Sequence, residues 1–227
     1  MKRLKQSVFI RRCFDFWNRY QLSPKRRRDI FEHIYRENHW RNEATRSGHG
    51  SSFEQTETIR SELPSLIARH DIRSLIDIAC GDYYWMQQVD LKLEDYIGID
   101  IVENLISRNV EKYGNPHRQF LRLDIVTSSL PRADLVFCRD LLVHFSVADI
   151  FKALTNIKKS GAIYLLTTTF PERQENADIL TGDWRPLNLE GAPFAFPAPV
   201  QLINENCTED AGAFRDKSLG LWKIADL

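Results

Sequence analysis

The residues best suited to chemistry stand at the ends of two short apolar runs. The run at 75–78 is rich in β-branched residues and leads into the turn at 79–82, ACGD, while the run at 96–99 ends in Asp100. This pattern predicts two parallel strands with a glycine turn after the first. Glycine lets a backbone approach a ligand closely, and an acid after the second strand can accept hydrogen bonds from ribose hydroxyls. We therefore expect a ligand outside the carboxyl ends of these strands.

The glycine spacing excludes two other kinds of phosphate site. A G-x-G-x-x-G fingerprint would need glycines where the chain has Ala79, Tyr83 and Tyr84, and no G-x-x-x-x-G-K-[ST] segment exists. A pyrophosphate cradle is thus not expected. A single glycine after a strand also occurs in α/β proteins of many kinds, so the turn alone does not define a function.

Further polar residues follow the next two predicted strands. Asp124 and Ile125 follow the strand expected at 119–123, and Arg139 and Asp140 follow the one at 134–138. Four residues beyond Asp140 stands His144. On a helix the two would share one face, so that the carboxylate could orient the imidazole as a general base for a hydroxyl. The alternative is a structural histidine beneath the ligand.

Taken together, these segments resemble the class I S-adenosylmethionine-dependent methyltransferases. The matching motifs are the segment 77–82 (DIACGD), Asp100, Asp124 and the segment 134–140 (DLVFCRD), and the resemblance covers roughly residues 50–227. A set of bacterial methyltransferase-like proteins also has an S-G-x-G-S segment before the first motif, as at 47–51 here. The chain departs from the family at Ala79 and Tyr83, where glycines are usual. The bulk of Tyr83 bears on the shape of the methionine end of the pocket.

The resemblance implies S-adenosylmethionine as cofactor and a set of residues for each role. Asp124 would accept from the adenine amine, and Ile125 would pack on the ring. His144 and Asp140 would be catalytic, and no metal is implied. The cofactor would be bound by Asp77, Ala79, Cys80, Gly81, Asp82, Asp100, Ile101, Asp124, Ile125, Cys138 and Arg139, and the acceptor by Trp40, Ser47, Gly48, Trp184 and Arg185. The alternative for Asp124 is a turn cap.

The implied fold is a doubly wound α/β domain. It has a mostly parallel seven-stranded sheet in the order 3-2-1-4-5-7-6, with the last strand antiparallel, and an N-terminal helical extension. Helical patterns at 53–70, 102–113 and 147–158 and strand patterns at 162–169, 200–204 and 219–225 fit this arrangement. The proline- and aromatic-rich stretch 170–199 would be a lid over the pocket. Alternatively, it packs against the sheet.

The N-terminal residues 1–46 differ in charge from the domain expected at 47–227. They hold 13 Lys and Arg against 5 Asp and Glu, although the whole chain has 31 of each. Apolar spacing predicts helices at 7–20 and 25–36. A basic arm of this kind could bind a nucleic acid. It could equally fold onto the acidic remainder of its own chain.

The whole sequence favours an enzyme acting on a small acceptor. No apolar run of 18 residues predicts a membrane span, and the four cysteines lack C-x-x-C or zinc spacing, which is typical of a cytoplasmic protein. No [DNS]-P-P-[YFW] segment follows the fourth strand. We expect methyl transfer to an oxygen, less readily a nitrogen, of a small-molecule or saccharide-like acceptor. The alternatives are an RNA or DNA methyltransferase that uses residues 1–46, and a non-catalytic binding or scaffold protein.

Overall fold

A single seven-stranded sheet forms the centre of the computed structural model, which describes residues 27–227. The strand order is β3-β2-β1-β4-β5-β7-β6, and β7 alone runs antiparallel, to both β5 and β6. The predicted fold class is therefore confirmed. The strands are β1 (Ser74–Ile78), β2 (Asp95–Asp100), β3 (Arg118–Arg122), β4 (Leu135–Cys138), β5 (Tyr164–Thr169), β6 (Gln201–Asn204) and β7 (Ser218–Lys223).

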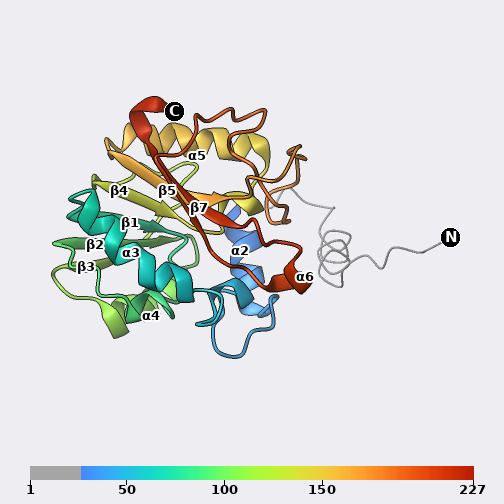
Figure 1. Ribbon diagram of the computed structural model, residues 1–227. Coiled ribbons are helices and arrows are strands. Elements are labelled where there is room, and N and C mark those ends of the chain that lie inside the picture. Colours follow the sequence, from blue (N-terminus) through green and yellow to red (C-terminus); the bar gives the residue numbers. More distant parts are fainter. Residues whose placement is uncertain (1–26) are drawn as a thin grey trace.

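Helices cover both faces of the sheet and give a three-layer architecture (Figure 1). Helix α5 (Val147–Lys159) packs on the face that carries Ile76 and Ile78, whereas α3 (Glu57–Arg69) and α4 (Glu103–Tyr113) pack on the face that carries Leu75. Central strands are apolar on both faces because helices bury both. Ser146 caps the N-terminus of α5, and its side chain accepts a hydrogen bond from the Asp149 N–H.

The segments that follow β1 and β2 differ in structure. The connection between β1 and β2 contains no α-helix, only the 3₁₀ turn η2 (Met86–Gln88). In α4, which follows β2, Val110 is 50% exposed whereas Asn109 is buried. The buried stripe of α4 also contains Leu105 and Ile106, which are four and three residues before Asn109.

The stretch 170–199 packs largely against the body of the domain. Leu187 and Leu189 are fully buried in the cluster that contains α5, and Phe194 and Phe196 join them. This packing matches the alternative in which the aromatic and apolar residues of 170–199 pack against the sheet. Its role as a lid stays a prediction.

The described residues include part of the basic N-terminal region. Helix α2 (Arg27–Arg36) coincides with most of the helix expected at 25–36, whereas the helix expected at 7–20 lies outside the described residues. Within residues 27–227, no helix is long and apolar enough to span a membrane. The boundary predicted at residue 46 between extension and domain stays a prediction.

Candidate active site

One cavity of about 770 Å³ opens at the carboxyl ends of β1, β2 and β4. Its size falls within the range of roughly 300–1,000 Å³ typical of small-molecule sites. Most of the residues predicted from the sequence line it: Trp40, Ser47, Gly48, Asp77, Ala79, Cys80, Gly81, Asp82, Asp100, Ile101, Asp124, Ile125, Arg139, Asp140, His144 and Trp184. The topology thus brings together the ends of several strands, as parallel sheets do.

The turn after β1 is held in a conformation that requires glycine at its third position. Gly81 has a φ of 56°, and a Cβ atom there would lie 2.1 Å from Ser47 Oγ. Its N–H donates to Asp100 Oδ2 at 3.3 Å, and its carbonyl accepts from Asn109 Nδ2 at 2.8 Å. Asn109, which the sequence analysis missed, therefore fixes the turn from α4. Its position on an otherwise apolar buried stripe was the available signal.

Tyr83 does not enter the cavity. Its side chain is buried on the far side of the turn, with its ring centroid 5.3 Å from those of Tyr96 and Phe120 and 5.1 Å from that of Tyr113. A φ of 58° at Tyr83 lets the chain place the ring there. The expectation that its bulk alters the pocket is therefore wrong.

Asp82 fastens the loop that precedes α3 to the turn. Thr45 Oγ1 donates to Asp82 Oδ1 at 2.9 Å, the Arg46 N–H donates to Oδ2 at 2.9 Å, and Ser47 Oγ donates to Oδ1 at 3.2 Å. The Ser47 hydroxyl in turn accepts from the Asp82 N–H. The segment at 47–51 consequently forms a wall of the cavity. Thr45 was not predicted from the sequence.

Two buried carboxylates lie at the floor of the cavity. Tyr96 donates its hydroxyl to Asp77 Oδ2 at 2.5 Å, and burial of Asp77 raises its pKa to about 7. Burial also raises the pKa of Asp100, opposed by hydrogen bonds from the N–H groups of Val102 and Gly81. Each Asp100 oxygen accepts one backbone N–H, at 3.0 Å from Val102 and 3.3 Å from Gly81, which leaves acceptor capacity on both.

Asp124 is held by a residue of the basic region. Arg27 of α2 donates to its carboxylate from Nε at 3.1 Å and Nη2 at 2.9 Å, and the Val126 N–H donates to it at 2.9 Å. Arg27 also reaches Asp149 from Nη1 at 3.1 Å. The carboxylate expected to accept the adenine amine thus already has several donors. Arg27 gave no sequence signal beyond its place in a basic run.

His144 stands on the opposite side, in the 3₁₀ turn η3 (Leu142–His144). Its Nδ1 lies 2.8 Å from the Asp183 carbonyl oxygen, and its ring centroid is 5.6 Å from that of Trp40. A carbonyl only accepts, so Nδ1 carries the proton and Nε2 carries the lone pair of the neutral ring. Burial lowers the pKa of His144, which favours this neutral form.

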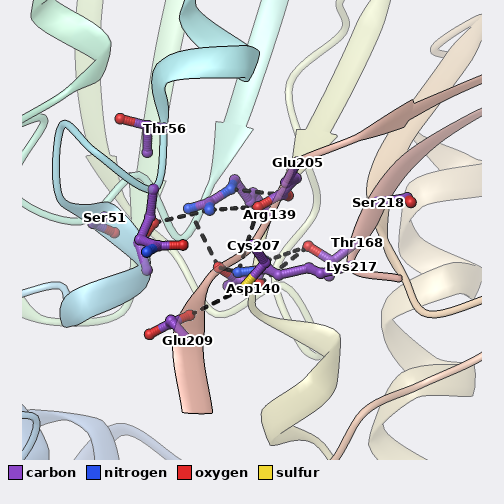
Figure 2. A network of polar contacts seen from close by, with 12 residues as sticks. Ser51, Thr56, Arg139, Asp140, Thr168, Glu205, Cys207, Glu209, Lys217 and Ser218 are labelled. Carbon is purple, nitrogen blue, oxygen red and sulfur yellow. Dashed lines mark hydrogen bonds and ion pairs between the residues drawn. The ribbon is translucent and has the colours of Figure 1, made fainter. Parts of the chain in front are cut away.

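Asp140 belongs to a network of buried charges at the acceptor side of the cavity (Figure 2). Lys217 Nζ lies 2.7 Å from Asp140 Oδ2, and Arg139 Nη2 lies 2.7 Å from Glu205 Oε2. The two cations hold the pKa of Asp140 well below its usual range. This network joins the end of β4 to the strands β6 and β7. Glu205 and Lys217, remote in sequence, were not predicted.

A family comparison identifies the part of the chain that forms this cavity. Residues 76–166 match the model of a methyltransferase domain. This segment, which runs from within β1 into β5, is similar to methyltransferase domains. The resemblance drawn from the motifs is thereby confirmed, as is the enzyme class, and the methyl donor of the family is S-adenosylmethionine. No curated protein sequence matches the chain.

Solved structures of methyltransferases share the fold. The N-methyltransferase NodS of Bradyrhizobium japonicum WM9 has a TM-score of 0.57 at 14% identity, over 77% of this chain and 98% of its own. The methyltransferase domain of bacterial CtHen1-CN has a TM-score of 0.56 at 10% identity, over 74% and 99%. Human N-acetylserotonin methyltransferase, solved with S-adenosylmethionine, has a TM-score of 0.56 at 12% identity, over 93% and 66%.

The cavity fits the donor in size and charge. Its volume of about 770 Å³ suits a small molecule, and Asp100 keeps acceptor capacity for ribose hydroxyls. The carboxylates of Asp77 and Asp100 are suited to a ligand that bears a sulfonium and an ammonium. When bound, S-adenosylmethionine supplies an electrophilic methyl group.

Three sequence-based expectations about this methyltransferase site are wrong in their geometry. Asp140 does not orient His144, because η3 is a 3₁₀ turn and the Asp140 carboxylate turns to Lys217 while the Asp183 carbonyl holds the imidazole. Cys138 is fully buried within the sheet and does not line the cavity. Arg185, 5% exposed, donates to the carbonyl groups of Leu142, Phe145 and Ala177 and so cannot reach an acceptor.

The described residues offer no alternative chemistry based on metal or thiolate. Within 27–227, no group of three or more His, Cys, Asp or Glu is arranged to hold a metal ion. Cys80 does line the cavity, but burial and the nearby Asp100 and Asp77 raise its pKa well above the usual range. Its thiol stays protonated near neutral pH, so we assign it no nucleophilic role.

Proposed function

We propose that the domain transfers a methyl group from S-adenosylmethionine to a hydroxyl oxygen, less readily a nitrogen, of a small ring-containing acceptor, with His144 as general base. The observation that carries this proposal is the hydrogen bond between His144 Nδ1 and the Asp183 carbonyl oxygen. The His144 side chain lines the same cavity as the Gly81 turn. This bond leaves the lone pair on Nε2. His144 is therefore prepared to accept a proton.

The proposed step needs little from the protein beyond alignment and one base. The acceptor oxygen attacks the methyl carbon in line, the O–C bond forms as the S–C bond breaks, and Nε2 of His144 takes the hydroxyl proton. The rigid anchor at Asp183 and the contact with Trp40 restrict the imidazole. Positioning of this kind supplies much of the rate enhancement in displacement reactions.

The walls around His144 favour an acceptor with a ring. Trp184 packs against Phe214 with ring centroids 4.8 Å apart, and Trp40 lies on the imidazole, while all of these residues line the cavity. Aromatic faces bind flat rings and the apolar faces of sugars through a large contact area. This supports the small-molecule or saccharide-like class over an extended polymer.

The two alternative functions have less support. The burial of Tyr83 away from the cavity removes the main argument for a non-catalytic scaffold. A nucleic-acid substrate was inferred from the basic residues 1–46, of which Arg27 pairs with Asp124 and Asp149 of its own chain. Much of that basic region lies in residues 1–26, outside the described part, so this alternative stays a prediction.

Calorimetric titration with S-adenosylmethionine, S-adenosylhomocysteine and NAD tests the cofactor half of the proposal. We expect the first two to bind and NAD not to bind. Asp100→Ala should weaken both by about ten- to hundredfold, because it removes the acceptor for the ribose hydroxyls and one partner of the Gly81 N–H. Asp95→Ala, an exposed acid at the start of the same strand, is the control and should leave both affinities unchanged.

Failure of S-adenosylhomocysteine to bind the wild-type protein would overturn the enzyme proposal. Equal losses in the Asp100 and Asp95 variants would overturn the assignment of Asp100. Where binding is established, transfer of a labelled methyl group to a panel of hydroxylated ring compounds and their amines tests the acceptor half.

A further inference from the structure

The acceptor side of the cavity has two walls of unlike chemistry. One is aromatic and contains Trp40, Trp184 and Phe214, all close to His144 or to each other. The other is charged and comes from the end of β4 and from the connection between β6 and β7. Its members that line the cavity are Arg139, Asp140, Glu209, Asp210 and Lys217. A molecule between the walls would contact both.

The positive charges of the second wall are already neutralised. Lys217 Nζ lies 2.7 Å from Asp140 Oδ2 and 3.5 Å from Glu205 Oε2. Arg139 lies 2.7 Å from Glu205 and 3.2 Å from Asp140. Two buried cations thus face two carboxylates, the buried Glu205 and the partly exposed Asp140, and each carboxylate pairs with both cations. Neither Lys217 nor Arg139 has an uncompensated charge to offer to an anionic acceptor.

Glu209 adds a further carboxylate to this wall, and its charge helps to raise the pKa of both Arg139 and Lys217, whose charges Asp140 and Glu205 already balance. Its Oε2 accepts only a weak contact from the Cys207 thiol, at 3.7 Å (Figure 2). Among residues 27–227, no Lys, Arg or His nitrogen lies within 4.0 Å of this carboxylate. The exposed Asp210 beside it has the same sign. The wall as a whole is therefore negative on its cavity side.

Gly50 lies next to Asp140, Lys217 and Glu209, and it has no side chain to occupy the space between them. A Cβ atom built on Gly50 would lie 3.2 Å from Asp140 Oδ2, 3.4 Å from Lys217 Nζ and 3.6 Å from Glu209 Oε2. The backbone of Gly50 is not in the left-handed region, so its conformation does not require glycine. The absence of a side chain instead lets the loop approach the charged wall.

The backbone that presents Glu209 is strained. The two residues after it, Asp210 and Ala211, have φ values of 51° and 56° with ψ values of 46° and 35°. Left-handed conformations of this kind are unfavourable for residues other than glycine, because Cβ comes too close to the following carbonyl oxygen. Such strain is concentrated at binding and catalytic sites. Here it bends the connection at the edge of the cavity.

We infer that the acceptor carries an ammonium group, which Glu209 binds while the ring of the acceptor packs on the aromatic wall. This inference rests on the proposed function, because it assigns the acceptor of that reaction. A cation gains from both walls, since carboxylates form charge-assisted hydrogen bonds with ammonium groups and aromatic faces attract cations. A phosphate or carboxylate acceptor would meet a wall in which carboxylates outnumber the cations Arg139 and Lys217.

The test measures how the charge of a ring compound affects its binding in the presence of saturating S-adenosylhomocysteine. One series is glucosamine, N-acetylglucosamine and glucuronate, and the other is tryptamine, indole-3-acetamide and indole-3-acetate. Dissociation constants come from nuclear magnetic resonance titration. We expect the ammonium member of at least one series to bind about tenfold or more tightly than its neutral and anionic counterparts.

Glu209→Gln should then reduce the ammonium affinity to that of the neutral compound and leave S-adenosylhomocysteine binding unchanged. Glu190→Gln, the same change at an exposed residue that does not line the cavity, is the control and should have no effect. The absence of an ammonium preference in both series, or its persistence in Glu209→Gln, overturns the inference. Because S-adenosylhomocysteine binding is measured first, failure of the proposed function itself would show separately.

Discussion

At the scale of single residues, the proposed reaction depends on His144 as the general base. The Asp183 carbonyl fixes one ring nitrogen, and burial keeps the ring neutral by lowering its pKa. His144→Gln should therefore slow methyl transfer by roughly 10²- to 10⁴-fold, the usual contribution of a general base. The measurement is the single-turnover rate with an established acceptor, together with S-adenosylhomocysteine affinity, which should not change.

The pH dependence of transfer gives a second readout for His144. A base must be unprotonated, so the wild-type rate should fall as pH decreases, with a midpoint below the ordinary histidine value of 6.5. His117→Gln is the control, because His117 also places Nδ1 against a backbone carbonyl, that of Glu94, but lies outside the cavity. A rate loss of equal size in both variants, or loss of cofactor affinity in His144→Gln, would disprove the assignment.

At the scale of elements, helix α2 is attached to the domain through Arg27. This guanidinium bridges Asp124 at the end of β3 and Asp149 in α5, while Phe31 and Tyr35, four and eight residues later, line the same cavity. One face of α2 therefore forms a wall of the cofactor site. The described part of the basic region folds onto acidic residues of its own chain, which is one of the two expectations for it.

Arg27→Met tests this attachment. Because the change leaves two partly buried carboxylates without their cation, we expect it to lower the free energy of unfolding by about 1–2 kcal/mol, after allowance for solvent screening. Arg28→Met is the matched control, since Arg28 is more exposed and, among residues 27–227, pairs only with Asp29 and Glu32 of its own helix. Chemical denaturation measures both. Equal effects would show that α2 is not held by the Arg27 bridge.

At the scale of the whole molecule, carboxyl groups whose pKa values are shifted in the folded state make stability depend on pH in a definite way. The folded-state pKa of Asp77, about 7, is above its ordinary value of 3.8, so its contribution to stability is full below pH 3.8 and is lost as pH rises to about 7. Asp134 and Asp140 act in the opposite sense, because their lowered pKa values contribute stability above pH 3.8 that is lost on further acidification.

Asp77→Asn isolates the first effect, since an amide keeps the acceptor for the Tyr96 hydroxyl without the charge. The stability of the variant relative to the wild type should rise between pH 4 and pH 7, by up to about 1.4 kcal/mol per pH unit, and then level off. Denaturation curves across this range measure it. Asp95→Asn at the exposed start of β2 is the control. A difference that does not vary with pH would contradict the raised pKa of Asp77.

The sequence by itself determined the sheet and the cofactor half of the cavity. Strand runs such as Leu135–Cys138 are apolar on both faces because helices bury both, and the order of the motifs places Gly81 and Asp100 at the same sheet edge. Signals of this kind are local: they depend on side-chain periodicity and on what a single backbone position tolerates. That is why the fold class and the methyltransferase family were predictable.

Only the tertiary structure decided which side chains act together around the acceptor. Lys217 and Glu205 reach Arg139 and Asp140 across many residues, and the Asp183 carbonyl rather than Asp140 orients His144. Arg185, a candidate for acceptor binding in the sequence, is instead buried against backbone carbonyls. Long-range ion pairs and backbone acceptors leave no periodic pattern, because they depend on where strands and connections meet in space rather than on neighbours along the chain.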